Sequence, residues 1–315
     1  MRRKFSVFPG GTRMRKGTIF SLFSFLFIVI VVGHYVIVAQ APLTGTWSAN
    51  TRDEKNGKIN IQFEIRGSGN GHHSTGESFD YSDLNGLSAA QTQNGRVSFQ
   101  LAREAGTIQC EGNFVNGNGS GTFTFTPNQA FIDGMRSRGF DFTKPMNNRG
   151  DDDINDRLFT AAAVNVTTAL ADDLLSANFG KLGVDDLFKA AIFKIDGKFM
   201  AEMKSTGFPN LGMEDLVKAR IFKIDADYVR QVNDMGFDKQ DFEGLVKFRI
   251  FKVTPEFLAD LKNEGFTNLS PEEVVKFRIF NIDTDFIRKA KAENPNVTVE
   301  DMVKMKIGVY RRSDN

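Results

Sequence analysis

The sequence predicts an α+β multidomain protein: an N-terminal signal or anchor helix, a small antiparallel β sandwich or partial barrel, and a C-terminal, solenoid-like array of α-helical hairpin repeats. Three observations predict this fold class. A long apolar run ends near residue 41, short alternating segments fill residues 42–143, and near-identical copies follow one another every 29 residues from Leu182. A fixed period of roughly 20 to 50 residues is typical of stacked supersecondary units that cannot bury their apolar faces alone.

Residues 1–41 have the pattern of a targeting segment. Six basic residues precede or flank an apolar run from Ile19 to Val38, and Ala39-Gln40-Ala41 then has the small-residue spacing of a signal-peptidase site. The run is about 20 residues long, which is also enough to cross a bilayer as a retained anchor. A compact signal would start at Met14 instead of Met1. All these alternatives predict an exported chain that is periplasmic, extracellular or in the cell envelope, and membrane-anchored if the run is retained.

Residues 42–143 are expected to form five to seven antiparallel strands. Apolar and polar residues alternate, as in half-buried strands, over Lys58–Arg66, Arg96–Leu101, Thr107–Phe114 and Gly121–Phe125. Asn-Gly dipeptides tolerate the positive φ angles of tight hairpin turns, and they begin at Asn56, Asn94, Asn116 and Asn118. A short helix is expected over Phe131–Gly139. The strands therefore predict a sandwich or a partial barrel.

Gly45-Thr46-Trp47, at the head of the first strand, resembles the G-x-W signature at the start of lipocalin barrels, where the tryptophan plugs one end. The resemblance implies a small apolar ligand, with Trp47 as a candidate ligand-binding residue. The segment is about half as long as a lipocalin, however, and small barrels fill their interior with side chains. We expect Trp47 to be a core residue and keep ligand binding as the alternative.

The residues that carry catalysis or bind metals are scarce. Cys110 is the single cysteine, so the chain has no intrachain disulfide framework, and the three histidines do not form an H-E-x-x-H zinc motif. His72-His73 is expected in a solvated loop within a glycine-rich stretch, and His34 lies in the apolar run. No spacing selects a catalytic pair among the carboxylates Asp80, Asp83, Glu104 and Glu111. We predict no enzyme activity, no metal and no cofactor.

Residues 144–153 have the composition of an exposed linker, and the helical repeat domain is expected over 154–315. A degenerate copy precedes four full copies, and a partial copy follows them: 153–181, 182–210, 211–239, 240–268, 269–296 and 297–310. The outer copies are expected to cap the array. In copy 211–239 the apolar columns, Ile221 among them, are expected to be buried against neighbouring copies.

Each copy carries the start and stop signals of two short helices. The second helix is expected to begin after a side chain that can accept a hydrogen bond from a free N–H, at Thr167, Asp196, Asp225, Thr254 and Asp283. It is expected to end at a residue that tolerates a left-handed conformation, at Asn178, Gly207, Gly236, Gly265 and Asn294. Ser270-Pro271 with Glu273 predicts a capping box at the start of a first helix.

A Lys-x-Arg stripe recurs in the last turns of the first helices, at Lys218, Arg220, Lys247, Arg249, Lys276 and Arg278. Acidic residues stand in the first turns, so the order complements the helix dipole. An interaction surface for an anionic partner is the alternative. Residues 211–239 contain five bases and six acids, and the whole chain has 40 basic against 39 acidic residues. Nucleic acid would require a basic excess, so we expect none as a partner.

The pattern over residues 246–258, Val-Lys-Phe-Arg-Ile-Phe-Lys-Val-Thr-Pro-Glu-Phe-Leu, and Glu-Gly-Phe-Thr-Asn-Leu at 264–269 is similar to tandem repeats in bacterial exported or membrane-bound proteins. Some of those repeats trail metallopeptidases of the beta-lactam-sensor type. The resemblance covers about half of this chain, residues 153–310, and it brings no catalytic residue with it. It implies a bacterial envelope protein built from two-helix repeats.

These observations favour an exported, non-enzymatic protein-interaction scaffold. The repeat array would present the surface to a protein partner in the cell envelope, and the β domain would be a second contact or a spacer. Two alternatives stay open: small apolar-ligand binding by the lipocalin-like β domain, and a role as an accessory or regulatory subunit of an envelope complex. Membrane contact is expected only through residues 19–38, if they are retained.

Overall fold

A computed structural model describes residues 42–51, 57–66, 72–145, 153–178, 180–237 and 240–309. Pro42–Asn315 belong to one compact unit. The predicted signal or anchor helix lies outside the described residues. So do Asn56 and most of the expected linker, and the domain boundary there stays a prediction.

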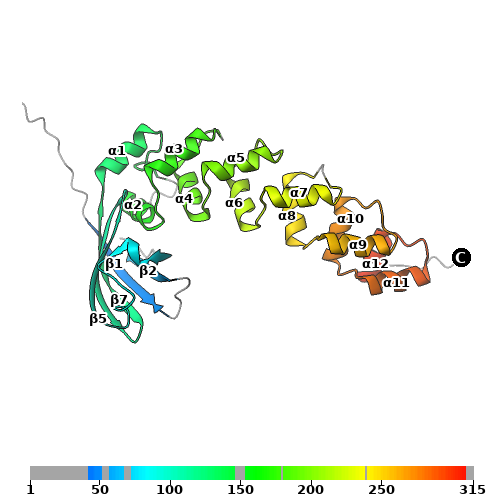
Figure 1. Ribbon diagram of the computed structural model, residues 1–315, viewed down its shortest axis with the longest axis horizontal. Helices are drawn as coiled ribbons and strands as arrows, with labels where there is room; N and C mark the ends of the chain where they lie inside the picture. Colours follow the sequence, from blue (N-terminus) through cyan, green and yellow to red (C-terminus); the bar gives the residue numbers. More distant parts are fainter. Residues whose placement is uncertain are drawn as a thin grey trace, which may run out of the picture. The chain divides into compact units, whose positions relative to one another are not determined.

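Seven strands form one antiparallel sheet in the described part of the chain, in the order β3-β2-β1-β7-β6-β5-β4. The sheet is a half-barrel (Figure 1). The prediction of an antiparallel partial barrel is confirmed, and the alternative of a two-sheet sandwich is wrong. The strands are β1 (Leu43–Asn50), β2 (Lys58–Arg66), β3 (His72–Asp80), β4 (Leu84–Asn85), β5 (Asn94–Arg103), β6 (Gly106–Val115) and β7 (Asn118–Pro127).

Only one of the three described Asn-Gly dipeptides forms the expected hairpin. Asn116 and Gly117 have φ angles of 50° and 78° and connect β6 to β7, as a tight turn requires. Asn94-Gly95 and Asn118-Gly119 instead lie within strands, where Asn94 and Asn118 both pair with Val115. His72-His73 is also strand, because it pairs with the end of β2, so the prediction of a loop is wrong. Pairing with distant segments outweighs the local turn preference at these positions.

The concave face of the sheet is filled by a helix from beyond the expected linker. Helix α2 (Ile154–Ala163) packs against β1, β3, β6 and β7 (Figure 1). The Phe159 ring stacks on Phe123, with 4.9 Å between ring centroids, and meets Phe63 and Phe125 edge-on at 5.5 and 5.6 Å. The first helix of the degenerate copy therefore belongs to the core of the β-sheet.

The remaining described helices are short, and most come in pairs. They are α1 (Gln129–Ser137), α3 (Thr168–Ser176), α4 (Val184–Phe193), α5 (Gly197–Ser205), α6 (Met213–Ile221), α7 (Ala226–Asp234), α8 (Phe242–Ile250), α9 (Pro255–Asn263), α10 (Pro271–Ile279), α11 (Thr284–Glu293) and α12 (Val299–Lys306). Each pair from α2–α3 to α10–α11 corresponds to one copy of the repeat. Among the described helices, none is singly long and apolar enough to span a membrane, although the pair α2 and α3, bent by 83°, passes the same test of length and composition.

The predicted helix starts are confirmed. All five expected side chains accept a hydrogen bond from a backbone N–H in the first turn of α3, α5, α7, α9 and α11. Ser270 and Glu273 form the expected capping box of α10. These bonds satisfy donors that a short helix would otherwise leave unpaired.

The helix ends are confirmed except at Asn294. Asn178 and the three glycines have positive φ angles, between 54° and 98°, whereas Asn294 is extended, with φ −143° and ψ 104°. Asn294 precedes Pro295, whose ring forces the preceding residue into an extended conformation. A second left-handed column, absent from the predictions, ends the first helices at Asn165, Lys194, Lys223, Lys252 and Asn281.

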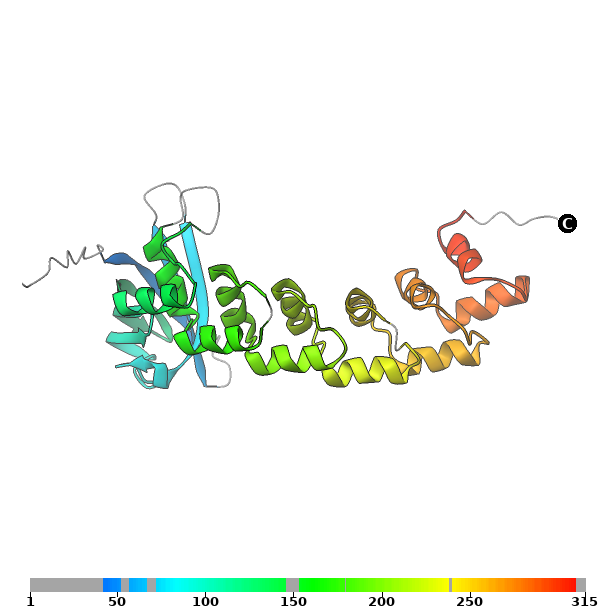
Figure 2. The same cartoon turned by 90° about the horizontal axis from the view of Figure 1, so that it is seen from above.

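The first two copies contact each other through α3, which packs against α4 and α5, and later copies contact each other through their first helices. Helix α4 packs against α6, and α10 packs against both α8 and α12. Figure 2 shows these first helices side by side, with the second helices in a separate row. One cluster of buried residues continues from the sheet to Val275 in α10. Helices of this length are marginal alone in water, so the contacts between copies stabilise them. That the whole repeat array forms a solenoid stays a prediction.

Candidate functional site

Trp47 is a core residue. The side chain is 2% exposed, and its indole N–H donates to the Glu111 carbonyl oxygen at 3.2 Å. Its ring packs against the rings of Phe99 and Phe114, with centroids 5.2 and 5.7 Å away. A Cβ at Gly112 would lie against the same indole, so glycine makes room for the ring. The expected core role accounts for Trp47, and its ring presents no free face to a ligand.

The groups considered for catalysis do not converge. Cys110 is fully buried, and burial raises the pKa of its thiol to about 12. Asp80 pairs with Lys58 and Asp83 with Arg103, while a Glu104 carboxylate oxygen accepts from the Thr168 N–H at 2.8 Å. No group of three or more metal-ligating side chains occurs among the residues that the structure describes.

The arginines of the Lys-x-Arg stripe join each copy to the one before it. Arg249 lies over the Tyr228 ring, 3.7 Å from the ring centroid, and donates to the Lys223 carbonyl oxygen at 2.8 Å. Arg220 and Arg278 repeat this geometry over Phe199 and Phe257, and they donate to Lys194 and Lys252. Each guanidinium thus combines a cation–π contact with a bond to the carbonyl of a left-handed residue.

Two lysines of the stripe, and Lys189 at the equivalent position of the first full copy, join each copy to the one after it. Ion pairs connect Lys189 to Glu214 and Lys218 to Glu243 at 2.5 Å, and Lys276 to Glu300 at 2.7 Å. In the same series Lys247 would pair with Glu272, but within the described ranges these two residues make no ion pair. Five of the six predicted interaction-surface residues therefore make contacts between copies, and Lys247 is the exception.

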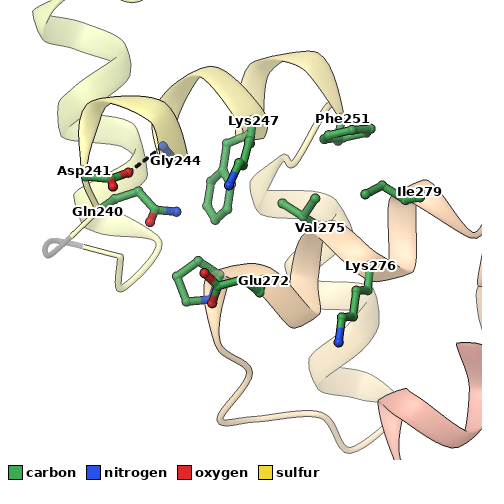
Figure 3. A pocket seen from close by; sticks show the side chains of 11 residues that line it. Gln240, Asp241, Gly244, Lys247, Phe251, Glu272, Val275, Lys276 and Ile279 are labelled. Carbon is green, nitrogen blue, oxygen red and sulfur yellow. Dashed lines mark hydrogen bonds between the residues drawn. The ribbon is translucent and has the colours of Figure 1, made fainter.

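Lys247 and Glu272 line a groove of about 430 Å³ between α8 and α10 (Figure 3). The partly buried Phe251 and Ile279, which is 47% exposed, contribute apolar surface to it, and the buried Phe248 and Val275 lie beneath. Gly244 stands where the other full copies have a carboxylate residue, and Gln240 occupies the space beside it. Opposite charges therefore flank an apolar surface, an arrangement that suits a chemically mixed ligand.

A column of exposed isoleucines runs along the first helices. These side chains are 47–54% exposed and occupy equivalent positions in five copies: Ile192, Ile221, Ile250, Ile279 and Ile307. The prediction that Ile221 is buried is wrong. Ile221 lies three residues after Lys218 and seven after Glu214, so a 3.6-residue period places it on the charged, outward face of α6. The sequence contained this signal.

No protein-family model matches the chain, and no curated protein matches it.

Proposed function

We propose that this chain is an exported, non-enzymatic scaffold that binds a protein partner along the first helices of its repeats. The isoleucine column carries the proposal. Five β-branched apolar side chains, each about half exposed, recur with the repeat although the fold does not bury them. Exposed apolar patches with a polar rim are typical of protein-interaction sites, and we infer that the isoleucines, repeated at one position of each copy, contribute to such a site.

The rim supports the same proposal. The lysine and arginine columns beside the isoleucines are engaged in contacts between copies, which hold the helices in position. A partner would therefore meet a largely pre-organised surface and lose little side-chain entropy on it. In the degenerate copy the equivalent position is Ala163, which is 4% exposed on the helix that the β-sheet covers.

The test is capture of partners from the cell envelope by the full chain and by an I221K/I250K/I279K variant. We expect the triple variant to recover at least tenfold less of each specific partner, with an unchanged melting temperature, because the three side chains are half exposed. V115K is the matched control, since Val115 is 55% exposed in the β-sheet. Equal recovery by all three proteins, or recovery of no protein, would contradict the proposal.

Export is a separate part of the proposal, and the apolar run from Ile19 to Val38 supports it. N-terminal sequencing of the chain from its own cells distinguishes the two forms. A start after Ala39 or Ala41 indicates a cleaved signal, and an intact run indicates an anchor. Recovery of the chain from the cytoplasmic fraction with residues 1–41 intact would contradict export.

A further inference from the structure

The third full copy, 240–268, departs from its neighbours at Gln240, just before its first helix, and at Gly244, within the first turn of that helix. Gln240 stands where the other full copies have leucine, and Gly244 stands where they have aspartate or glutamate. In those copies the acidic side chain bonds to the backbone at the start of the helix, as Asp215 does with the N–H of Gly212. In this copy Asp241 caps the helix instead, by accepting from the Gly244 N–H at 2.7 Å.

These two substitutions act together. A Cβ at position 244 would overlap the Gln240 side chain, so the glutamine occupies the space that the glycine leaves. The Gln240 Nε2 atom is buried and has no hydrogen-bond partner. Figure 3 shows the amide end of Gln240 directed toward the groove between α8 and α10. A buried donor without a partner is costly, and an acceptor on a ligand would satisfy it.

The groove also contains the one lysine of this repeated position, Lys247, that forms no ion pair with the next copy within the described residues. In the neighbouring pairs of copies the lysine and the acid lie 2.5–2.7 Å apart and close the surface between adjacent first helices. Within the described residues, Lys247 and Glu272 form no such ion pair. Figure 3 shows them on facing helices, on opposite sides of the groove. Lys247 is therefore free to pair with an acid of a ligand, and Glu272 with a base.

We propose that this groove binds a segment of a partner protein in which an acidic and a basic side chain flank an apolar one. The apolar side chain packs on Phe251 and Ile279. The acid pairs with Lys247, with the Gln240 amide as a second donor, and the base pairs with Glu272. This inference rests on the proposed scaffold function and assigns a specific site to it.

The charges of the groove select this class of occupant. The lining residues include two carboxylates, Asp241 and Glu272, and two ammonium groups, Lys247 and Lys276, of which Lys276 already pairs with Glu300. The balance disfavours a polyanion such as nucleic acid or an anionic membrane. Ile279, 47% exposed, belongs both to the groove and to the isoleucine column, so one partner could contact both.

The experiment selects peptides from a displayed random library of twelve-residue peptides, with the full chain as the target. The closing variant is Q240L/G244D, which restores the residues of the first two full copies. Replacing Gly244 alone would leave Gln240 in the way, so the two changes are made together. We expect enriched peptides to bind the closing variant at least tenfold more weakly, with no fall in its melting temperature.

Charge reversal tests the assigned pairs. In K247E/E272K the two charges change places, and we expect the selected peptides to carry the acid and the base in reversed order. The control is K218E/E243K, which reverses a pair that is closed at 2.5 Å and should leave peptide binding unchanged. Failure to enrich any peptide, or equal binding of the same peptides to the wild type, the closing variant and the charge-reversed variant, would overturn the groove assignment. If the triple isoleucine variant nevertheless loses its partner, the scaffold function stands and only the groove falls.

Discussion

Replacing Phe159 by alanine tests the central feature of the fold, a helix of the repeat region that fills the half-barrel. Phe159 is 0% exposed and packs against Phe63 of β2 and Phe125 of β7, with ring centroids 5.5 and 5.6 Å away, besides stacking on Phe123. Large-to-small core substitutions of phenylalanine cost about 3–5 kcal/mol, and aromatic pairs add about 0.5–1.5 kcal/mol each. We expect F159A to lose about 4–5 kcal/mol of unfolding free energy, at the upper end of the range for the substitution.

Trp47 provides the assay, because it is the only tryptophan and lies in the core of the same sheet. Urea unfolding followed by Trp47 fluorescence should show a midpoint lowered by roughly 2 M, for a slope of about 2 kcal/mol/M. The matched control is F286A, which removes a partly buried ring on α11 beneath Lys306. We expect F286A to leave the Trp47 transition unchanged.

Truncation provides an independent check of the same feature. A fragment of residues 42–145 lacks α2, so its concave face would expose the rings that Phe159 covers. We expect it to lack a cooperative Trp47 transition, and a fragment of residues 42–181 to regain it. A loss below about 1 kcal/mol in F159A, or cooperative unfolding of the shorter fragment, would refute the role assigned to α2.

Three further predictions concern single residues. R249K should lose about 1–2 kcal/mol of unfolding free energy in urea titrations, because lysine cannot both stack on Tyr228 and donate to the backbone as the guanidinium does; wild-type stability would contradict this. Cys110, with its pKa raised to about 12, should resist iodoacetamide at pH 8 in the folded chain and react after unfolding, and rapid labelling of the native protein would contradict its burial. Hydrogen bonding to Lys276 lowers the pKa of Glu300, so this pair stabilises the folded state above the carboxylate's unfolded pKa, and the contribution disappears as pH falls through the folded pKa. Amide exchange in α12 should then rise on acidification in wild type and change less in E300Q, and equal pH dependence in both would exclude this pair as the cause.

The sequence determined the local features of the repeats. A helix cap depends on residues within three or four positions, so Thr167, Asp225 and Ser270 could be assigned from spacing alone, and the structure confirms them. Asn-Gly dipeptides predicted turns less well: Asn116-Gly117 forms one, whereas Asn94-Gly95 and Asn118-Gly119 lie within strands. The prediction of a left-handed helix end at Asn294 was wrong, because the following Pro295 restricts Asn294 to an extended conformation.

The tertiary structure decided what covers each surface. The concave face of the sheet is filled by Phe159, a residue outside the β segment, and no alternation pattern names the side chain that will fill a half-barrel. Ile221 lies at the edge between the stripe of the buried Val217 and the charged face of Glu214 and Lys218, and the stacking of the copies leaves it 53% exposed. The groove at Gly244 likewise exists only because α8 and α10 lie side by side. Hydrogen bonds at a cap form within one turn of the chain, whereas burial depends on which distant segment lies against a face.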